Sequence, residues 1–255
     1  MSESHDFSSS SAAPALLTSA LLTAERPALP QGYTPEQVIA ALEPLSEDRR
    51  KARILDVVRQ RVGSVTVLLD MPRDPHNGAA VVRSADAFGV PEVHVVQRDP
   101  TFFVGHRVAQ GTERWVEVVQ HQAAEDAVTA LRARGFRLIA THPNGALVPE
   151  DLRNLERVCL LLGNEHDGIS EALARAADAS VRIPMRGFVE SLNLSVAAAV
   201  LLNAALAGRP GDLSSAEVRR WYAAGLVRSV PRSAEILAAL REEGCPRDKL
   251  GTPET

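Results

Sequence analysis

The chain has 255 residues, 45% of them hydrophobic and 24% charged, so it can bury the core of one good-sized domain with extensions, or of two small ones. Its net charge of −4 excludes a uniformly basic nucleic-acid-binding protein, so any RNA contact must come from a local basic patch. No apolar run reaches the length of a membrane span, the N-terminus lacks the basic region of a signal peptide, and Cys159 and Cys245 have no metal-ligand spacing. We therefore expect a reduced, cytoplasmic protein without disulfides, a metal site or a membrane partner.

The first 46 residues are rich in Ser, Ala and Pro, which is typical of a flexible leader, with a short helix over 35–43 as the exception. Residues 47–62 predict a basic amphipathic helix whose apolar stripe includes Ile54 and Val58. The basic residues of this helix are either an ordinary solvated face or a surface that contacts phosphates; they are Arg49, Arg50, Lys51, Arg53, Arg59 and Arg61.

Strands and helices alternate from residue 65 to residue 206, which favours a mostly parallel sheet with helices on both faces. We expect strands over 65–70, 93–96, 115–119, 137–141, 158–162 and 181–184. We expect a turn over 74–78 and helices over 79–88, 123–134, 169–178 and 192–206, the last one buried and capped by Ser191. The stretch 102–114 predicts an irregular excursion, and 149–155 is helix-like or irregular.

The chain changes character after Gly208, where two amphipathic helices are expected at about 214–223 and 233–243. A second basic cluster lies here, made of Arg219, Arg220, Arg228 and Arg232. Trp221 and Tyr222 either pack in a core or stack on bases, and packing is the commoner outcome for such a pair.

Three polar stretches stand out within the alternating region: DPHNGAAVVRSADAFG at 74–89, LLGNEHDGI at 161–169, and the run from IPM at 183–185 to ESLNLSVA at 190–197. Each follows a predicted strand, and ligands in open α/β sheets bind at the carboxyl ends of strands. No G-x-G-x-x-G or P-loop follows any strand, so a nicotinamide or nucleoside-triphosphate enzyme is not supported.

These three stretches, in this order, resemble the three motifs of the SPOUT-class methyltransferases, in the SpoU/TrmH branch. The resemblance implies an α/β fold, with a mostly parallel sheet flanked by helices and a deep trefoil knot near its C-terminal end. It suggests a methyltransferase domain over 47–207 that includes the basic helix, between the leader, 1–46, and a helical extension, 208–255.

The same resemblance implies that S-adenosylmethionine binds in the knot, held largely by backbone groups. The positions that match cofactor contacts of the family are Thr141, Gly163, Ile183 and Leu192. Ile183 and Leu192 are also ordinary core residues by type, and the two roles are compatible because apolar walls are typical of cofactor pockets.

The reaction implied is methyl transfer to a ribose 2′-hydroxyl, a poor nucleophile that must lose its proton near the transition state. Arg83 matches the family's arginine near the 2′-oxygen, and the other candidate catalytic residues are Asn77, Glu165, Ser191 and Asn193. Arg83 either stabilises the developing alkoxide and orients a phosphate that accepts the proton, or has a strongly lowered pKa. For Asn77 and Asn193, turn and cap roles are the alternative.

Within the branch, the chain is most similar to the enzymes that methylate guanosine 18 in the D-loop of tRNA. We therefore expect a metal-independent homodimer that acts on tRNA and not on DNA, with residues of both subunits at each active site. A ribosomal-RNA methyltransferase of the same branch is the nearest alternative, but the Pro/Ser-rich leader does not suggest the compact RNA-binding domain that would favour it. A non-catalytic RNA-binding protein is the other alternative, and the presence of Arg83, Asn77, Glu165 and Asn193 together argues against it.

Overall fold

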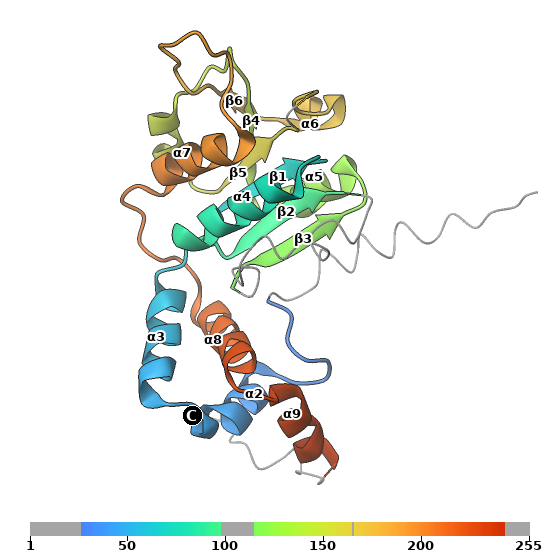
Figure 1. Ribbon diagram of the computed structural model, residues 1–255, viewed down its shortest axis with the longest axis vertical. Coiled ribbons are helices and arrows are strands. Elements are labelled where there is room, and N and C mark those ends of the chain that lie inside the picture. The colour runs from blue at the N-terminus through green and yellow to red at the C-terminus, as the bar shows by residue number, and fades with distance from the viewer. Residues whose placement is uncertain (1–26, 98–114, 165, 243–255) are drawn as a thin grey trace, which may run out of the picture.

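The structure, a computed structural model, describes residues 27–97, 115–164 and 166–242. Its centre is one sheet in which every neighbouring pair of strands is parallel, in the order β3-β2-β1-β5-β4-β6 (Figure 1). The strands are β1 (Val65–Asp70), β2 (Glu92–Val96), β3 (Glu117–His121), β4 (Arg137–Thr141), β5 (Val158–Leu162) and β6 (Ala179–Val181). The predicted mostly parallel sheet is confirmed.

Helices cover both faces of the sheet, as predicted (Figure 1). One face carries α4 (Pro75–Ala87), α7 (Leu194–Leu206) and the short 3-10 helix η4 (Pro149–Asn154), and α7 packs against both others. The other face carries α5 (Ala124–Ala133) and α6 (Glu171–Ala176), which pack against each other. Within the described part of the chain, no helix is long and apolar enough to cross a membrane.

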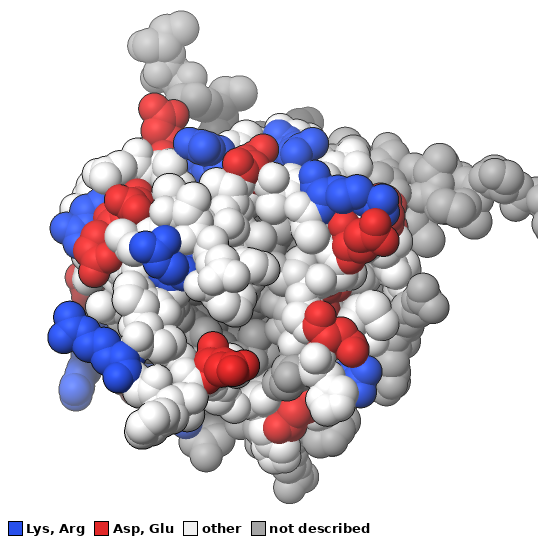
Figure 2. Space-filling model, turned by 90° about the horizontal axis from the view of Figure 1, so that it is seen from above, with Lys and Arg blue, Asp and Glu red and all other residues white. Residues whose placement is uncertain are grey.

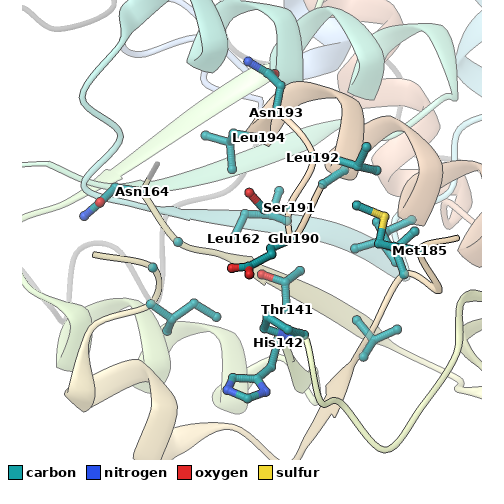
Figure 3. A pocket seen from close by; sticks show the side chains of 18 residues that line it. Thr141, His142, Leu162, Asn164, Met185, Glu190, Ser191, Leu192, Asn193 and Leu194 are labelled. Atoms are coloured by element: carbon teal, nitrogen blue, oxygen red, sulfur yellow. The ribbon is translucent and has the colours of Figure 1, made fainter. Parts of the chain in front are cut away.

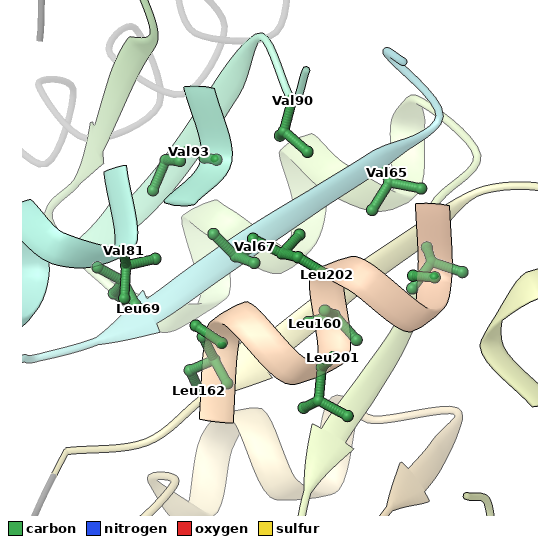
Figure 4. Close-up of a cluster of buried hydrophobic side chains, with 14 of the residues drawn as sticks. Val65, Val67, Leu69, Val81, Val90, Val93, Leu160, Leu162, Leu201 and Leu202 are labelled. Atoms are coloured by element: carbon green, nitrogen blue, oxygen red, sulfur yellow. The ribbon is translucent and has the colours of Figure 1, made fainter. Parts of the chain in front are cut away.

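The main core lies between the sheet and the α4/α7 layer (Figure 4). Strands β1 and β5, in the middle of the sheet, are buried along their whole length, which explains their nearly continuous apolar sequences. Leu201 and Leu202 of α7 are fully buried against this layer. The predicted burial of the Ala/Leu/Val-rich helix holds for the face that carries these leucines, whereas Val196 and Val200 on the helix are exposed.

Four helices form a separate hydrophobic cluster below the sheet, from both ends of the described chain (Figure 1). They are α2 (Pro35–Leu42), α3 (Asp48–Arg59), α8 (Ser215–Ser229) and α9 (Ser233–Glu242), and a 3-10 turn, Glu43–Leu45, follows α2. Trp221 and Tyr222 of α8 are buried in this cluster, so packing is the correct interpretation of that pair.

Several local predictions need correction. Residues 74–78 are not a separate turn: Asp74 caps α4 by accepting from the His76 N–H (2.8 Å), and Pro75 occupies the first helical turn, where its missing N–H costs nothing. The last strand is β6, at Ala179–Val181, so it ends before Pro184 instead of including it. Arg61 is buried and not part of a solvated face. The predicted excursion at 102–114 lies outside the described residues.

We expect Leu202→Ala to lower the free energy of unfolding by about 2–5 kcal/mol, because it leaves a cavity in the main core. Leu240→Ala is the matched control, since Leu240 is 38% exposed on α9 and little apolar area is lost there. Urea unfolding of both variants measures the difference. Equal destabilisation would contradict the placement of α7 in the core.

Candidate active site

A cavity of about 420 Å³ opens at the carboxyl ends of three neighbouring strands (Figure 3). Its walls come from the segments that follow β4, β5 and β6 and from the first turns of α7. The residues that line it are Thr141, His142, Pro143, Leu162, Gly163, Asn164, Gly168, Ile169, Val181, Ile183, Met185, Glu190, Ser191, Leu192, Asn193, Leu194, Ala197 and Leu201. The second and third sequence motifs therefore meet at one site.

All four residues that the sequence suggested as cofactor contacts lie in these walls. Thr141 is the last residue of β4, and its hydroxyl donates to the Leu161 carbonyl of β5 (3.1 Å). Ile183 and Leu192 are half-buried, and Ile183 also packs against the main core. Ile183 is thus a core residue and a wall of the cavity at once.

Gly163 follows β5 at the point where the second motif folds back on itself. The Asn164 N–H donates to the Gly168 carbonyl (3.0 Å) and the Gly168 N–H donates back (3.2 Å). This return places the backbone of Gly168 and Ile169 where a Cβ on residue 163 would lie. Only glycine fits this position without a shift of the backbone.

Asn193 joins the first and third motifs. Its side-chain amide donates to Asn77 Oδ1 in the first turn of α4 (3.0 Å), while its own Oδ1 accepts from the Ser195 N–H (2.8 Å) and the Ser195 hydroxyl (2.7 Å). Asn193 is therefore the N-cap of α7, and the prediction that Ser191 fills this role is wrong. The cap lies two residues later because Ser191 and Leu192 are not yet part of the helix, which begins at Leu194.

Ser191 lies in the wall beside Glu190, whose carboxylate the sequence analysis did not select (Figure 3). His142 and Met185 also line the cavity and were missed. For Glu190 and Met185 a signal was present, because both lie inside the third motif. For His142, which directly follows the end of β4 at Thr141, the only sequence signal for a place in the site was its position after a predicted strand.

Two other predicted catalytic residues, Arg83 and Glu165, are not among the described residues that line the cavity. Arg83 lies on the exposed side of α4, two turns after Asn77, and is not among the described residues that line the cavity of the same chain. Glu165 lies outside the described residues. His166 and Asp167, which the sequence suggested were loop residues, have their N–H groups bound to Asn164 Oδ1 (2.9 and 2.7 Å).

A sequence model described as the SpoU rRNA methylase family matches residues 64–203. The chain belongs to this family. The match begins just before β1 and ends within α7, so it covers the sheet, its helices and all three motifs.

Relatives and solved structures of this family resemble the chain beyond the motifs. The tRNA (guanosine(18)-2'-O)-methyltransferase of Escherichia coli is 38% identical over 156 residues, which is 60% of this chain and 67% of that protein. The enzyme of the same name from Thermus thermophilus is 38% identical over 164 residues, or 61% and 80%. The crystal structure of the Aquifex aeolicus TrmH/SpoU tRNA-modifying enzyme has 25% identity and a TM-score of 0.61, covering 78% of this chain and 98% of that chain.

One further structure bears on the cavity. The SpoU methyltransferase AviRb of Streptomyces viridochromogenes, solved in complex with the cofactor AdoMet, has 32% identity and a TM-score of 0.52 over 60% of each chain.

We expect Gly163→Ala to weaken S-adenosylmethionine binding by at least about tenfold, because its Cβ forces the Gly168–Ile169 backbone out of the cavity wall. Gly187→Ala is the control, since a Cβ there meets open space. Isothermal titration of both variants with the cofactor measures the effect. Equal affinities would show that the return at Gly168 does not shape the pocket.

Proposed function

We propose that this protein transfers a methyl group from S-adenosylmethionine to the ribose 2′-hydroxyl of guanosine 18 in tRNA. The observation that carries the proposal is the Asn193–Asn77 hydrogen bond, which joins the first motif to the cavity built by the other two. The names of the Escherichia coli and Thermus thermophilus relatives support tRNA and guanosine 18 as the target.

The cavity suits the cofactor in size and in chemistry. Its volume of about 420 Å³ lies in the range of pockets for small organic ligands, and leucine, isoleucine and methionine side chains form much of its wall. Thr141, Gly163, Ile183 and Leu192 would hold the cofactor, whose adenosine suits the apolar surface. When bound, S-adenosylmethionine supplies a methyl group already activated by its positive sulfur, so the protein need only orient and deprotonate the acceptor.

We assign the acceptor side to the first motif. Arg83 stabilises the negative charge that develops on the 2′-oxygen, as a fixed guanidinium does for an oxyanion. Asn193 and Asn77 hold α4 against the start of α7 and thus fix where Arg83 stands relative to the cavity. Ser191 and Glu165 of the third and second motifs complete the proposed catalytic group, with Ser191 in the cavity wall.

We propose that the active protein is a homodimer in which Arg83 of one subunit serves the cavity of the other. Arg83 does not line the cavity of its own chain among the residues described, although α4 packs against α7. Apolar side chains are exposed beside the cavity on the segment before α7 and on α7 itself: Phe188, Val189, Val196 and Val200. A partner subunit would cover this surface.

We also propose that the family's trefoil knot is present. The support is that the segment after β4 pairs with the end of β6: Leu147 and Val181 form a parallel bridge, and the Arg182 N–H donates to the Leu147 carbonyl (2.9 Å). Around the catalytic domain, 47–207, we propose that the leader, 1–46, and the extension, 208–255, serve RNA binding and not catalysis. The enzyme would act in the cytoplasm on tRNA.

We expect Arg83→Ala to abolish methyl transfer while S-adenosylmethionine still binds, because Arg83 acts on the acceptor and not on the cofactor. Arg153→Ala removes the same charge from an exposed position of η4 and is the control. Transfer of labelled methyl groups and isothermal titration provide the two readouts. Retained activity in Arg83→Ala would exclude the assigned role.

Mixing Arg83→Ala with Gly163→Ala tests whether the site is shared between subunits, at a cofactor concentration low enough to leave the Gly163→Ala pocket empty. We expect co-expressed Arg83→Ala and Gly163→Ala chains to regain about a quarter of wild-type activity, since half of the random dimers are mixed and each has one intact site. No recovery in purified mixed dimers would mean that each subunit uses its own Arg83.

The substrate is decided by offering unmodified tRNA transcript and ribosomal RNA side by side and mapping the methylated nucleoside. We expect 2′-O-methylguanosine at position 18 of tRNA. Product in ribosomal RNA alone, which the family's description makes the second candidate, would overturn the tRNA assignment.

A further inference from the structure

The loop before α7 carries a charged side chain on its inner side and apolar side chains on its outer side. Phe188 and Val189 are exposed, at 107% and 62% of their full surface, whereas the next residue, Glu190, lies in the wall of the cavity at the carboxyl ends of β4, β5 and β6. The Glu190 carboxylate is directed into this cavity, beside Thr141 (Figure 3). Apolar groups usually turn inward and carboxylates outward, so the inward charge calls for an explanation.

No group of the described chain neutralises Glu190. It is the one charged side chain among the described residues of the cavity wall, and its carboxylate forms no ion pair or hydrogen bond within the described residues. His142, also in the wall, accepts the Asn144 N–H with Nδ1 (3.1 Å), so this nitrogen carries no proton and the ring is neutral in this arrangement. The wall therefore presents an unpaired negative charge.

Two larger electrostatic features could mask a single carboxylate, and neither does. The N-terminal end of α7 borders the cavity, but a helix N-terminus is equivalent to only about half a positive charge, which is less than the charge of Glu190. On the end of the molecule that carries the loop before α7, basic and acidic side chains are interspersed (Figure 2). The wall therefore keeps a net negative character and favours a cation.

The proposed cofactor changes its charge in the reaction. S-adenosylmethionine has a positive sulfur, a positive amino group and a negative carboxylate, so it carries a net positive charge. S-adenosylhomocysteine, which remains after the methyl group leaves, has a neutral sulfur and no net charge. A carboxylate in the wall can therefore distinguish the methyl donor from the spent product, although the two have almost the same shape.

We propose that Glu190 is the counter-ion of the positive sulfur and makes the cavity bind S-adenosylmethionine more tightly than S-adenosylhomocysteine. The inference rests on the proposed function for the identity of the cofactor. Attraction between unit charges about 4 Å apart in water corresponds to roughly a fivefold gain in affinity, and the gain rises where the cavity excludes water. Because the loss of the methyl group removes this attraction, the product leaves and a new donor replaces it.

The same charge should affect binding and not the transfer step. The sulfur loses positive charge as the methyl group moves, so Glu190 stabilises the bound donor at least as much as the transition state. We therefore expect Glu190→Gln to raise the KM for S-adenosylmethionine about fivefold and to leave kcat at saturating cofactor within about twofold of wild type. Glu190 is a binding residue in this proposal and not a catalytic one.

Isothermal titration of the protein without RNA provides the direct test. The ligands are S-adenosylmethionine, S-adenosylhomocysteine and sinefungin, an analogue with an amine-bearing carbon in place of the methylated sulfur. We expect Glu190→Gln to weaken binding of the two positively charged ligands by about fivefold and to leave S-adenosylhomocysteine within about twofold. Glu190→Asp keeps the charge and should retain most of the preference. Glu150→Gln removes an exposed carboxylate of η4, outside the cavity wall, and should bind all three ligands as wild type does.

Circular dichroism of each variant checks that it is folded. Equal weakening of all three ligands by Glu190→Gln would overturn the proposal, because Glu190 would then bind a group that they share, such as the ribose hydroxyls. Unchanged affinities with lost methyl transfer would also overturn it and would assign Glu190 to the acceptor side. Wild-type protein that shows the expected preference but methylates only ribosomal RNA would refute the proposed tRNA target and leave the role of Glu190 intact, whereas wild-type protein that binds none of the ligands would refute both.

Discussion

The active-site cavity depends on one backbone contact, in which the segment after β4 lies directly on the end of β6. The His142 N–H donates to the Val181 carbonyl (3.0 Å), the Leu147 N–H to the Ser180 carbonyl (2.9 Å), and the Arg182 N–H to the Leu147 carbonyl (2.9 Å). Gly145 makes this approach possible, because a Cβ there would overlap the backbone at Val181. The contact fixes the chain after β6 beside the ends of β4 and β5, so that Ile183 and Thr141 face the same space.

The basic residues of 47–62 do not share one environment. Both interpretations of the basic helix, a solvated face or a surface that contacts phosphates, require exposed arginines. Arg49 and Arg59 are exposed, whereas Arg61, just after the helix, is buried against Trp221 and fits neither. Its partner Asp86 is half-buried, and burial, which outweighs the attraction of Arg61, raises the pKa of this carboxyl. Arg228, which lies near Arg61, likewise has a carboxylate partner, Glu117, at 3.7 Å.

The sequence predicted the sheet well because β1 and β5 are buried on both faces, and an unbroken run such as Val65–Leu69 leaves little alternative. The family resemblance pointed to Thr141, Gly163, Ile183 and Leu192, and all four line the cavity; their contact with the cofactor stays a prediction. Prediction from the sequence failed where the decision is made by tertiary contact. Serine and asparagine are both common N-cap residues, so residue type does not decide between Ser191 and Asn193. In the structure Asn193 is the cap, and its side chain also bonds to Asn77 of α4. Arginine is usually a surface residue, and the sequence around Arg61 gives no sign of burial. Its burial follows from the packing of α8, whose Trp221 lies against it.

Helix α4 is held at both ends by side-chain hydrogen bonds, and this follows from the spacing of its polar residues. Asn77 in its first turn bonds to the cap of α7, Arg83 lies in its middle, and Asp86 in its last turn bonds to Arg61. Both ends of the helix are therefore fixed by hydrogen bonds to different parts of the molecule, one beside the proposed cofactor site and one beside the four-helix cluster. Arg83 lies between these two ends, one turn before Asp86. The position of the arginine proposed to act on the 2′-oxygen therefore depends on contacts at both ends of α4, and not only on the cavity.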